Sequence, residues 1–120
     1  MTVRLAQLPH EYQTMCNNIN RMGAINHDHW VYLLNKYRDE GDANSEIEIK
    51  KYSKYLILSE MNLSDVDVTP YFDKIFEYGQ MGVARALRTL TPANCKLGEN
   101  YIVKKIREKF QEFFLKNMGE

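Results

Sequence analysis

The chain contains little cysteine, proline or histidine: 2, 3 and 3 residues respectively among 120. Cys16 and Cys95 have no metal-ligand spacing around them and are too few for a disulfide framework. All three histidines precede residue 30, so neither cysteine is followed by the histidine of a nucleophile motif. This scarcity excludes a disulfide-stapled secreted scaffold and favours a reduced, cytoplasmic setting.

Long hydrophobic runs are also absent. No stretch approaches the roughly 18 apolar residues of a membrane span. The first nine residues contain Arg4 but no apolar run of signal-peptide length. We therefore expect neither secretion nor membrane insertion.

Charge of one sign is not in excess, since 16 basic residues balance 16 acidic ones. The 44% hydrophobic content suits a globular core, and the length suits a single domain spanning residues 1–120. The balance hides an asymmetry. Residues 1–80 carry 8 Lys/Arg and 12 Asp/Glu, net −4, whereas residues 81–120 carry 8 and 4, net +4. Either the two halves attract each other in the folded domain, or the basic half is a surface for a polyanion.

Apolar residues recur at the three-and-four spacing of helices in five separate segments. The predicted helices are Pro9–Met22, His27–Glu40, Glu46–Met61, Thr69–Leu90 and Tyr101–Met118. These segments predict an all-α fold, a compact single domain of about five helices in an irregular orthogonal bundle.

The chain is organised around Thr69–Leu90, which we expect to be the central helix. Thr69 is a candidate cap, Pro70 suits the first helical position, and Pro92 is expected to stop the helix. The predicted inner face consists of Phe72, Ile75, Phe76, Gly79, Val83, Ala86, Leu87 and Leu90.

The glycines of Gly79-Gln80-Met81-Gly82 interrupt this apolar stripe. Each costs a helix about 1 kcal/mol relative to alanine, so each requires a reason. We expect a close approach of a neighbouring helix or a kink. The alternative is a hinge, or backbone exposed to a ligand.

Residues 46–61 have an ambiguous pattern, because Ile47 and Ile49 alternate with polar residues as in a strand. A helix is favoured because no turn residue divides the segment, and Ser45 with Glu48 resembles a capping box. Its predicted inner face is Ile47, Lys51, Tyr55, Leu58 and Met61. Residues 91–99 are predicted to form a loop, followed by a final helix capped by Asn100. That helix has the predicted inner face Ile102, Ile106, Phe110, Phe113 and Phe114.

Three candidate chemical sites are weak. Asp65-Val66-Asp67-Val68-Thr69 resembles the motif of haloacid-dehalogenase-type phosphohydrolases, which implies a metal-dependent phosphohydrolase using Asp65 and Asp67. A polar preceding segment and the lack of a later acidic pair oppose it. His27 and His29 point about 200 degrees apart on a helix and cannot share a metal there. Cys95 lies in a predicted loop and is the more reactive thiol if exposed. We expect no catalytic residue, metal or cofactor.

Basic residues gather in the last third of the chain. They are Arg85, Arg88, Lys96, Lys104, Lys105, Arg107 and Lys109. Two helices carrying such cations could bind phosphates like a helix-turn-helix. The nine-residue connection is too long for that motif, and the pI of 6.8 lacks a basic excess. Nucleic-acid binding, through residues 81–118, is therefore the alternative function.

The 8 tyrosines and 6 methionines are many for this length. Tyrosine is common at protein interfaces, and methionine adapts to irregular surfaces. We therefore predict a non-enzymatic interaction or regulatory protein that binds another protein, or a second copy of itself. The predicted contacts, which fall off the main apolar stripes, are Tyr32, Tyr52, Tyr71, Tyr78 and Met81.

Overall fold

The computed structural model describes residues 25–62 and 71–117, and within them every regular element is a helix. The elements are α2 (His27–Glu40), α3 (Ala43–Asn62), α4 (Phe72–Arg88), the short α5 (Pro92–Cys95) and α6 (Glu99–Asn117). The all-α prediction is confirmed. The predicted helix at residues 9–22, the Thr69-Pro70 opening and the Asp65/Asp67 motif lie outside the described residues.

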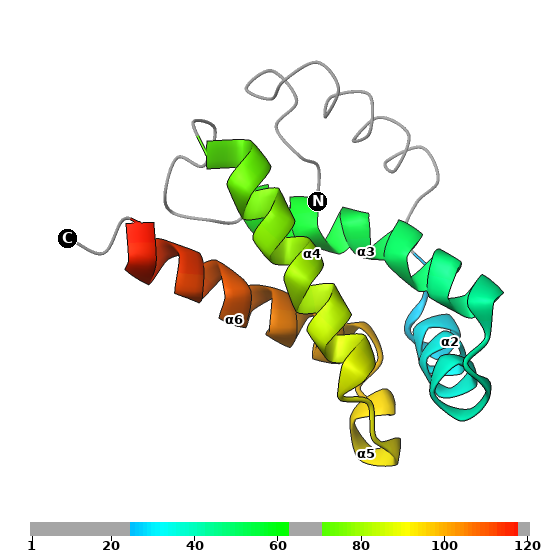
Figure 1. The fold of residues 1–120 in the computed structure, drawn as a ribbon. Coiled ribbons are helices and arrows are strands. Elements are labelled where there is room, and N and C mark those ends of the chain that lie inside the picture. The colour runs from blue at the N-terminus through cyan, green and yellow to red at the C-terminus, as the bar shows by residue number, and fades with distance from the viewer. Residues whose placement is uncertain (1–24, 63–70, 118–120) are drawn as a thin grey trace.

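The helices pack across one another, as an irregular orthogonal bundle requires. Figure 1 shows α4 crossing α3 and α6, with α2 beside one end of α3. The most extensive packing is between α4 and α6. Helices α3 and α6 also pack against each other and against α2.

Helix α2 has the predicted boundaries. The Asn26 side-chain oxygen accepts a hydrogen bond from the His29 N–H at 2.8 Å, and Gly41 ends the helix in the left-handed conformation with φ 61°. Trp30, Leu33 and Leu34, whose helical spacing predicts a shared inner face, are buried. The cap and the terminating glycine explain why this element could be predicted closely.

Helix α3 starts three residues earlier than predicted, and the predicted capping box is wrong. Asp42 caps the helix: its carboxylate accepts hydrogen bonds from the Ser45 N–H at 2.8 Å and the Ser45 hydroxyl at 2.7 Å. Ser45 is thus a buried residue of the first turn rather than the cap. The earlier start follows from Gly41, which already reverses the chain, so that Asp42 can be the first capping residue.

The inner face of α3 also differs from the prediction. Ile47 is 63% exposed and Lys51 is exposed, whereas Ile49 and Ile57 are fully buried. The buried positions are Ser45, Ile49, Ser53, Ile57, Leu58 and Met61. Ser45 and Ser53 interrupt the apolar spacing of this face, so the sequence pattern does not reveal it.

Helix α4 begins at Phe72, two residues after the predicted proline, and ends at Arg88. Its predicted inner face is confirmed except that Leu90, beyond the helix, is only partly buried.

The predicted loop after α4 contains α5, because Thr91 and Asn94 form a reciprocal capping box. Helix α6 begins at Glu99 rather than Tyr101, and Asn100 is an exposed residue within it.

The two glycines of α4 are sites of close helix packing, as the sequence predicted. A Cβ atom on Gly82 would lie 2.7 Å from the Lys105 carbonyl oxygen and 2.9 Å from the Ile106 Cα of α6. A Cβ on Gly79 would lie 2.6 Å from the Ile57 side chain of α3. The two glycines that interrupt the apolar stripe therefore let α4 approach α3 and α6 closely, and they do not expose backbone to a ligand.

Candidate functional site

The five predicted partner-binding residues are divided between two regions. Tyr32 is 56% exposed on α2, and Tyr52 on α3 packs its ring edge-on against Trp30 at 6.4 Å. Tyr78 and Met81 lie on α4 and Tyr71 is the N-cap residue of that helix, and their spacing of seven and three residues places them along one stripe. We call these three residues the Tyr/Met face.

The Tyr/Met face lies beside the end of α6. The rings of Tyr71 and Tyr78 both contact Phe113 edge-on, with centroids 6.0 and 5.3 Å away. Tyr71 remains 42% exposed and Met81 45% exposed. Aromatic packing therefore fixes the two tyrosine rings while leaving part of the face accessible.

A charged group borders the same face. Glu112 of α6 lies 3.9 Å from Arg85 of α4 and 3.2 Å from Lys109. Arg85 lies one helical turn after Met81, on the same side of α4 as Tyr78. An apolar centre with a polar margin is the usual layout of a protein-binding surface.

Four of the seven predicted nucleic-acid-binding cations lie close to carboxylates. Arg85 and Lys109 share Glu112, Lys105 lies 3.4 Å from Glu108, and Arg107 lies 2.6 Å from Glu60. The bond to Glu60 also raises the pKa of the Arg107 guanidinium. These four cations therefore have local anionic partners that compete with a phosphate.

The other three predicted cations are Arg88, Lys96 and Lys104. All are exposed, and no carboxylate of residues 25–62 or 71–117 forms an ion pair with them. They lie at the end of α4, after α5 and near the start of α6. They are what remains of the predicted basic surface.

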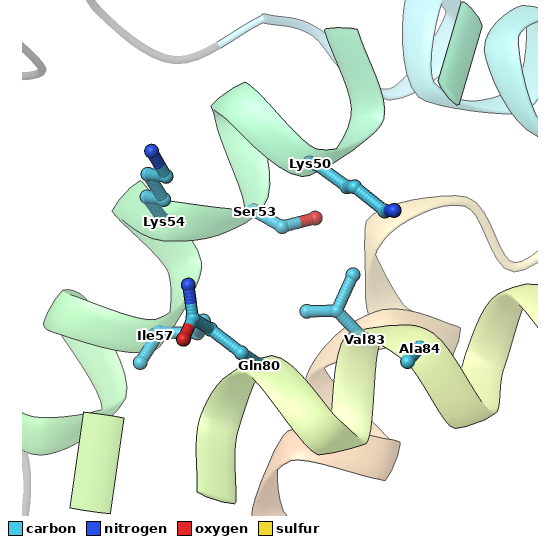
Figure 2. Close-up of a pocket in the computed structure, with 7 residues that line it drawn as sticks. All are labelled: Lys50, Ser53, Lys54, Ile57, Gln80, Val83 and Ala84. Carbon is cyan, nitrogen blue, oxygen red and sulfur yellow. The ribbon is translucent and has the colours of Figure 1, made fainter. Parts of the chain in front are cut away.

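A cavity of about 370 Å³ opens between α3 and α4. It is lined by Lys50, Ser53, Lys54, Ile57, Gln80, Val83 and Ala84, which we call the α3/α4 cavity. Figure 2 shows Ser53 and Lys50 projecting from α3 into the space above Val83, while Lys54 points away from α4. Gln80 extends from α4 toward Ile57.

The polar lining of the α3/α4 cavity is basic. Two of its residues are lysines and none is acidic. The Lys50 ammonium also bonds Glu46 at 2.7 Å, one turn earlier on α3. The Ser53 hydroxyl oxygen is buried and has no hydrogen-bond partner among the described residues.

Sequence reasoning missed this cavity. Ser53 did carry a signal, because it is a polar residue four positions from both Ile49 and Ile57, on one helical face. Nothing in the sequence of α3 indicated which part of α4 would face that position.

The two histidines of α2 bond different carboxylates and do not converge. His27 Nδ1 lies 2.6 Å from Glu99 of α6, and this hydrogen bond raises the pKa of the imidazole. His29 Nε2 lies 4.0 Å from Glu48 of α3. No three His, Cys, Asp or Glu side chains come together to hold a metal within the described ranges.

Cys95 is fully buried at the end of α5, so the exposed loop position on which its predicted reactivity depended is not observed. It ends α5, which packs on α2, and burial raises the pKa of the thiol even though Arg38 lies nearby. A raised pKa and a buried sulfur both lower reactivity.

No helix in the part of the chain that the structure describes is both long and apolar enough to cross a bilayer. Comparison of the chain with known protein families, curated proteins and solved structures gave no significant match.

Proposed function

We propose that this protein is a non-enzymatic interaction or regulatory protein that binds another protein through the Tyr/Met face. The observation that supports this proposal is the exposure of Tyr71 and Met81 on a helix whose other side supplies much of the core. Such partly exposed aromatic and thioether groups are the side chains that interfaces favour.

The packing of the face supports the same function. Phe113 holds the Tyr71 and Tyr78 rings in place, so binding costs little further ordering of these side chains. Arg85, Lys109 and Glu112 supply a polar margin that could set the orientation of a partner. A second copy of this chain is one candidate partner.

The proposal is tested with Met81→Asp in the full-length chain, because a charge at this exposed position opposes docking and leaves the core intact. Proteins captured from the native host are identified by mass spectrometry, purified and titrated against each variant. We expect at least tenfold weaker binding by Met81→Asp, the usual effect of losing about 1.4 kcal/mol. Leu97→Asp is the matched control, since Leu97 is 48% exposed but lies after α5.

Sedimentation over a range of protein concentrations shows whether the partner is a second copy. Association that Met81→Asp abolishes and Leu97→Asp retains would identify a dimer through this face. A host protein or self-association that binds both variants equally would contradict the proposal.

Nucleic-acid binding through residues 81–118 is the alternative, favoured by the unpaired state of Arg88, Lys96 and Lys104 among the described residues. Binding of a labelled duplex is measured at low and at higher salt. A steep loss of affinity with salt, reduced further by Lys104→Gln, would support this alternative. No binding at low salt would exclude it.

The phosphohydrolase hypothesis for Asp65 and Asp67 is the second alternative. Elemental analysis of the purified protein and turnover of a generic phosphate ester test it directly. Absence of both bound metal and turnover with added Mg²⁺ would end it.

A further inference from the structure

We propose that the α3/α4 cavity binds a small organic anion: a carboxylate or phosphate head on a short apolar body. This inference goes beyond the proposed protein-binding function and does not depend on it. The cavity lies between α3 and the α4 residues Gln80, Val83 and Ala84, whereas Tyr78 of the Tyr/Met face contacts Phe113 of α6.

The first observation is the unpaired hydroxyl of Ser53. A serine within a helix usually satisfies its hydroxyl by bonding the carbonyl one turn back. The Ser53 oxygen is buried with no hydrogen-bond partner in residues 25–62 or 71–117, and the residue is 1% exposed. The side chain points into the cavity, where a ligand oxygen would satisfy it (Figure 2).

The second observation is the sign of the charge around the cavity. Lys50 and Lys54 line it, and no acidic residue does. Lys50 shares its ammonium with Glu46, whereas Lys54 forms no ion pair with the acidic residues that the structure describes. Lys50 therefore contributes less positive charge than Lys54, but described lining residues that include lysines and no carboxylate, next to a buried O–H donor, favour an anionic oxygen over a cationic group.

The third observation is the size and remaining lining of the cavity. Ile57, Val83 and Ala84 supply apolar wall. The 370 Å³ volume lies near the lower end of ligand pockets, which span about 300–1,000 Å³. A short-chain organic anion fits these dimensions better than a nucleotide or a folded peptide.

Four probes separate the contributions of head and body. The full-length protein is titrated with hexanoate, hexyl phosphate, acetate and 1-hexanol, and binding is followed by amide chemical shifts. We expect saturable shifts at Ser53, Ile57 and Val83 with hexanoate or hexyl phosphate. Acetate and 1-hexanol should bind at least tenfold more weakly, because each lacks one half of the recognised chemistry. Whichever of hexanoate and hexyl phosphate binds with the lower Kd shows whether the cavity prefers a carboxylate or a phosphate head.

Ser53→Ala tests the hydroxyl itself. The substitution removes an unpaired buried oxygen, so the variant should fold and melt no lower than the wild type. It should bind the preferred anion about tenfold more weakly, so that at equal concentration the anion raises its melting temperature less than that of the wild type. Ser59→Ala on the same helix is the matched control, because Ser59 does not line the cavity.

Two further variants test charge and space. Lys50→Gln should reduce the preference for hexanoate over 1-hexanol, whereas Lys51→Gln, at an exposed position outside the cavity, should leave it unchanged. Ala84→Leu should block entry of every probe. Unchanged hexanoate binding in Ser53→Ala, or probe-induced shifts at residues away from α3 and α4, would overturn the proposal.

Discussion

Gly82 sets the distance between α4 and α6 because it has no side chain. The atoms that a Cβ would meet belong to the backbone of Lys105 and Ile106, which cannot rotate away. Gly79 faces Ile57 instead, where an added Cβ would lie 2.6 Å from Cγ2 and 3.3 Å from Cβ of a buried side chain, so these atoms have little room to move. The helical cost of about 1 kcal/mol per glycine is therefore offset by closer packing of the core helices.

Gly82→Ala is predicted to destabilise the protein even though alanine is the better helix former. Overpacking against α6 backbone costs about 1–3 kcal/mol and outweighs the propensity gain. Chemical denaturation measures the free energy of unfolding. Glu77→Ala, at an exposed position of α4, is the control and should change stability by less than about 0.5 kcal/mol. A Gly82→Ala variant more stable than the wild type would show that α4 and α6 are not closely packed.

Cys95 illustrates a second effect at the residue scale, where burial changes chemistry. Its sulfur is inaccessible and its thiol pKa is raised by burial. We predict that a thiol reagent modifies Cys95 in the native protein far more slowly than in denaturant, and at a rate limited by unfolding. Peptide mass spectrometry distinguishes Cys95 from Cys16. Equal rates in native and denatured protein would contradict the buried placement.

At the scale of the element, the helix starts depend on single polar side chains. Asn26 begins α2, Asp42 begins α3, and Thr91 with Asn94 begins α5. Each accepts a hydrogen bond from a backbone N–H that the helix itself leaves unpaired. In α3 the true cap lies three residues before the predicted one because Asp42 bonds both the backbone and the hydroxyl of Ser45.

Asp42→Ala is predicted to lower the melting temperature and to shorten α3 at its start. The bonds from Ser45 lower the pKa of the Asp42 carboxyl, so its contribution is present above the unfolded value and lost as pH falls through the folded value. The melting temperatures of variant and wild type should therefore differ at neutral pH and converge at low pH. Asn44→Ala, at an exposed neighbouring position, is the control and should show no such convergence.

At the scale of the whole molecule, two ion pairs join the acidic and basic halves of the chain. His27 bonds Glu99, and Glu60 bonds Arg107. The other ion pairs among the described residues lie within one half. Attraction between the halves is therefore local, and three cations of the basic half stay exposed and unpaired in the described ranges.

His27→Gln is predicted to destabilise the protein more at low pH than at high pH. The folded-state pKa of His27 is raised by Glu99, so the pair contributes fully below the unfolded value of about 6.5 and is lost as pH rises through the folded value. Melting temperatures of wild type and variant are compared between pH about 5.5 and about 8.5. His29→Gln is the control for removing a histidine from α2. A difference that grows with pH would contradict the predicted sign.

The sequence by itself determined the helical fold, most inner-face residues of α2, α4 and α6, and the close approach at Gly79 and Gly82. These features depend on periodicity and on local backbone chemistry, which a few consecutive residues carry. The starts of α3 and α6 and the helix within the predicted loop were missed because neighbouring polar residues compete for the same cap.

Only the tertiary structure decided which separate residues meet. It placed Tyr71 and Tyr78 beside Phe113, left Met81 exposed, and put Tyr32 and Tyr52 on other helices. It also buried Cys95 and brought Gln80 and Val83 opposite Ser53. The reason is physical: a helix pattern states which face is buried, but the crossing of two helices depends on the shapes of both surfaces.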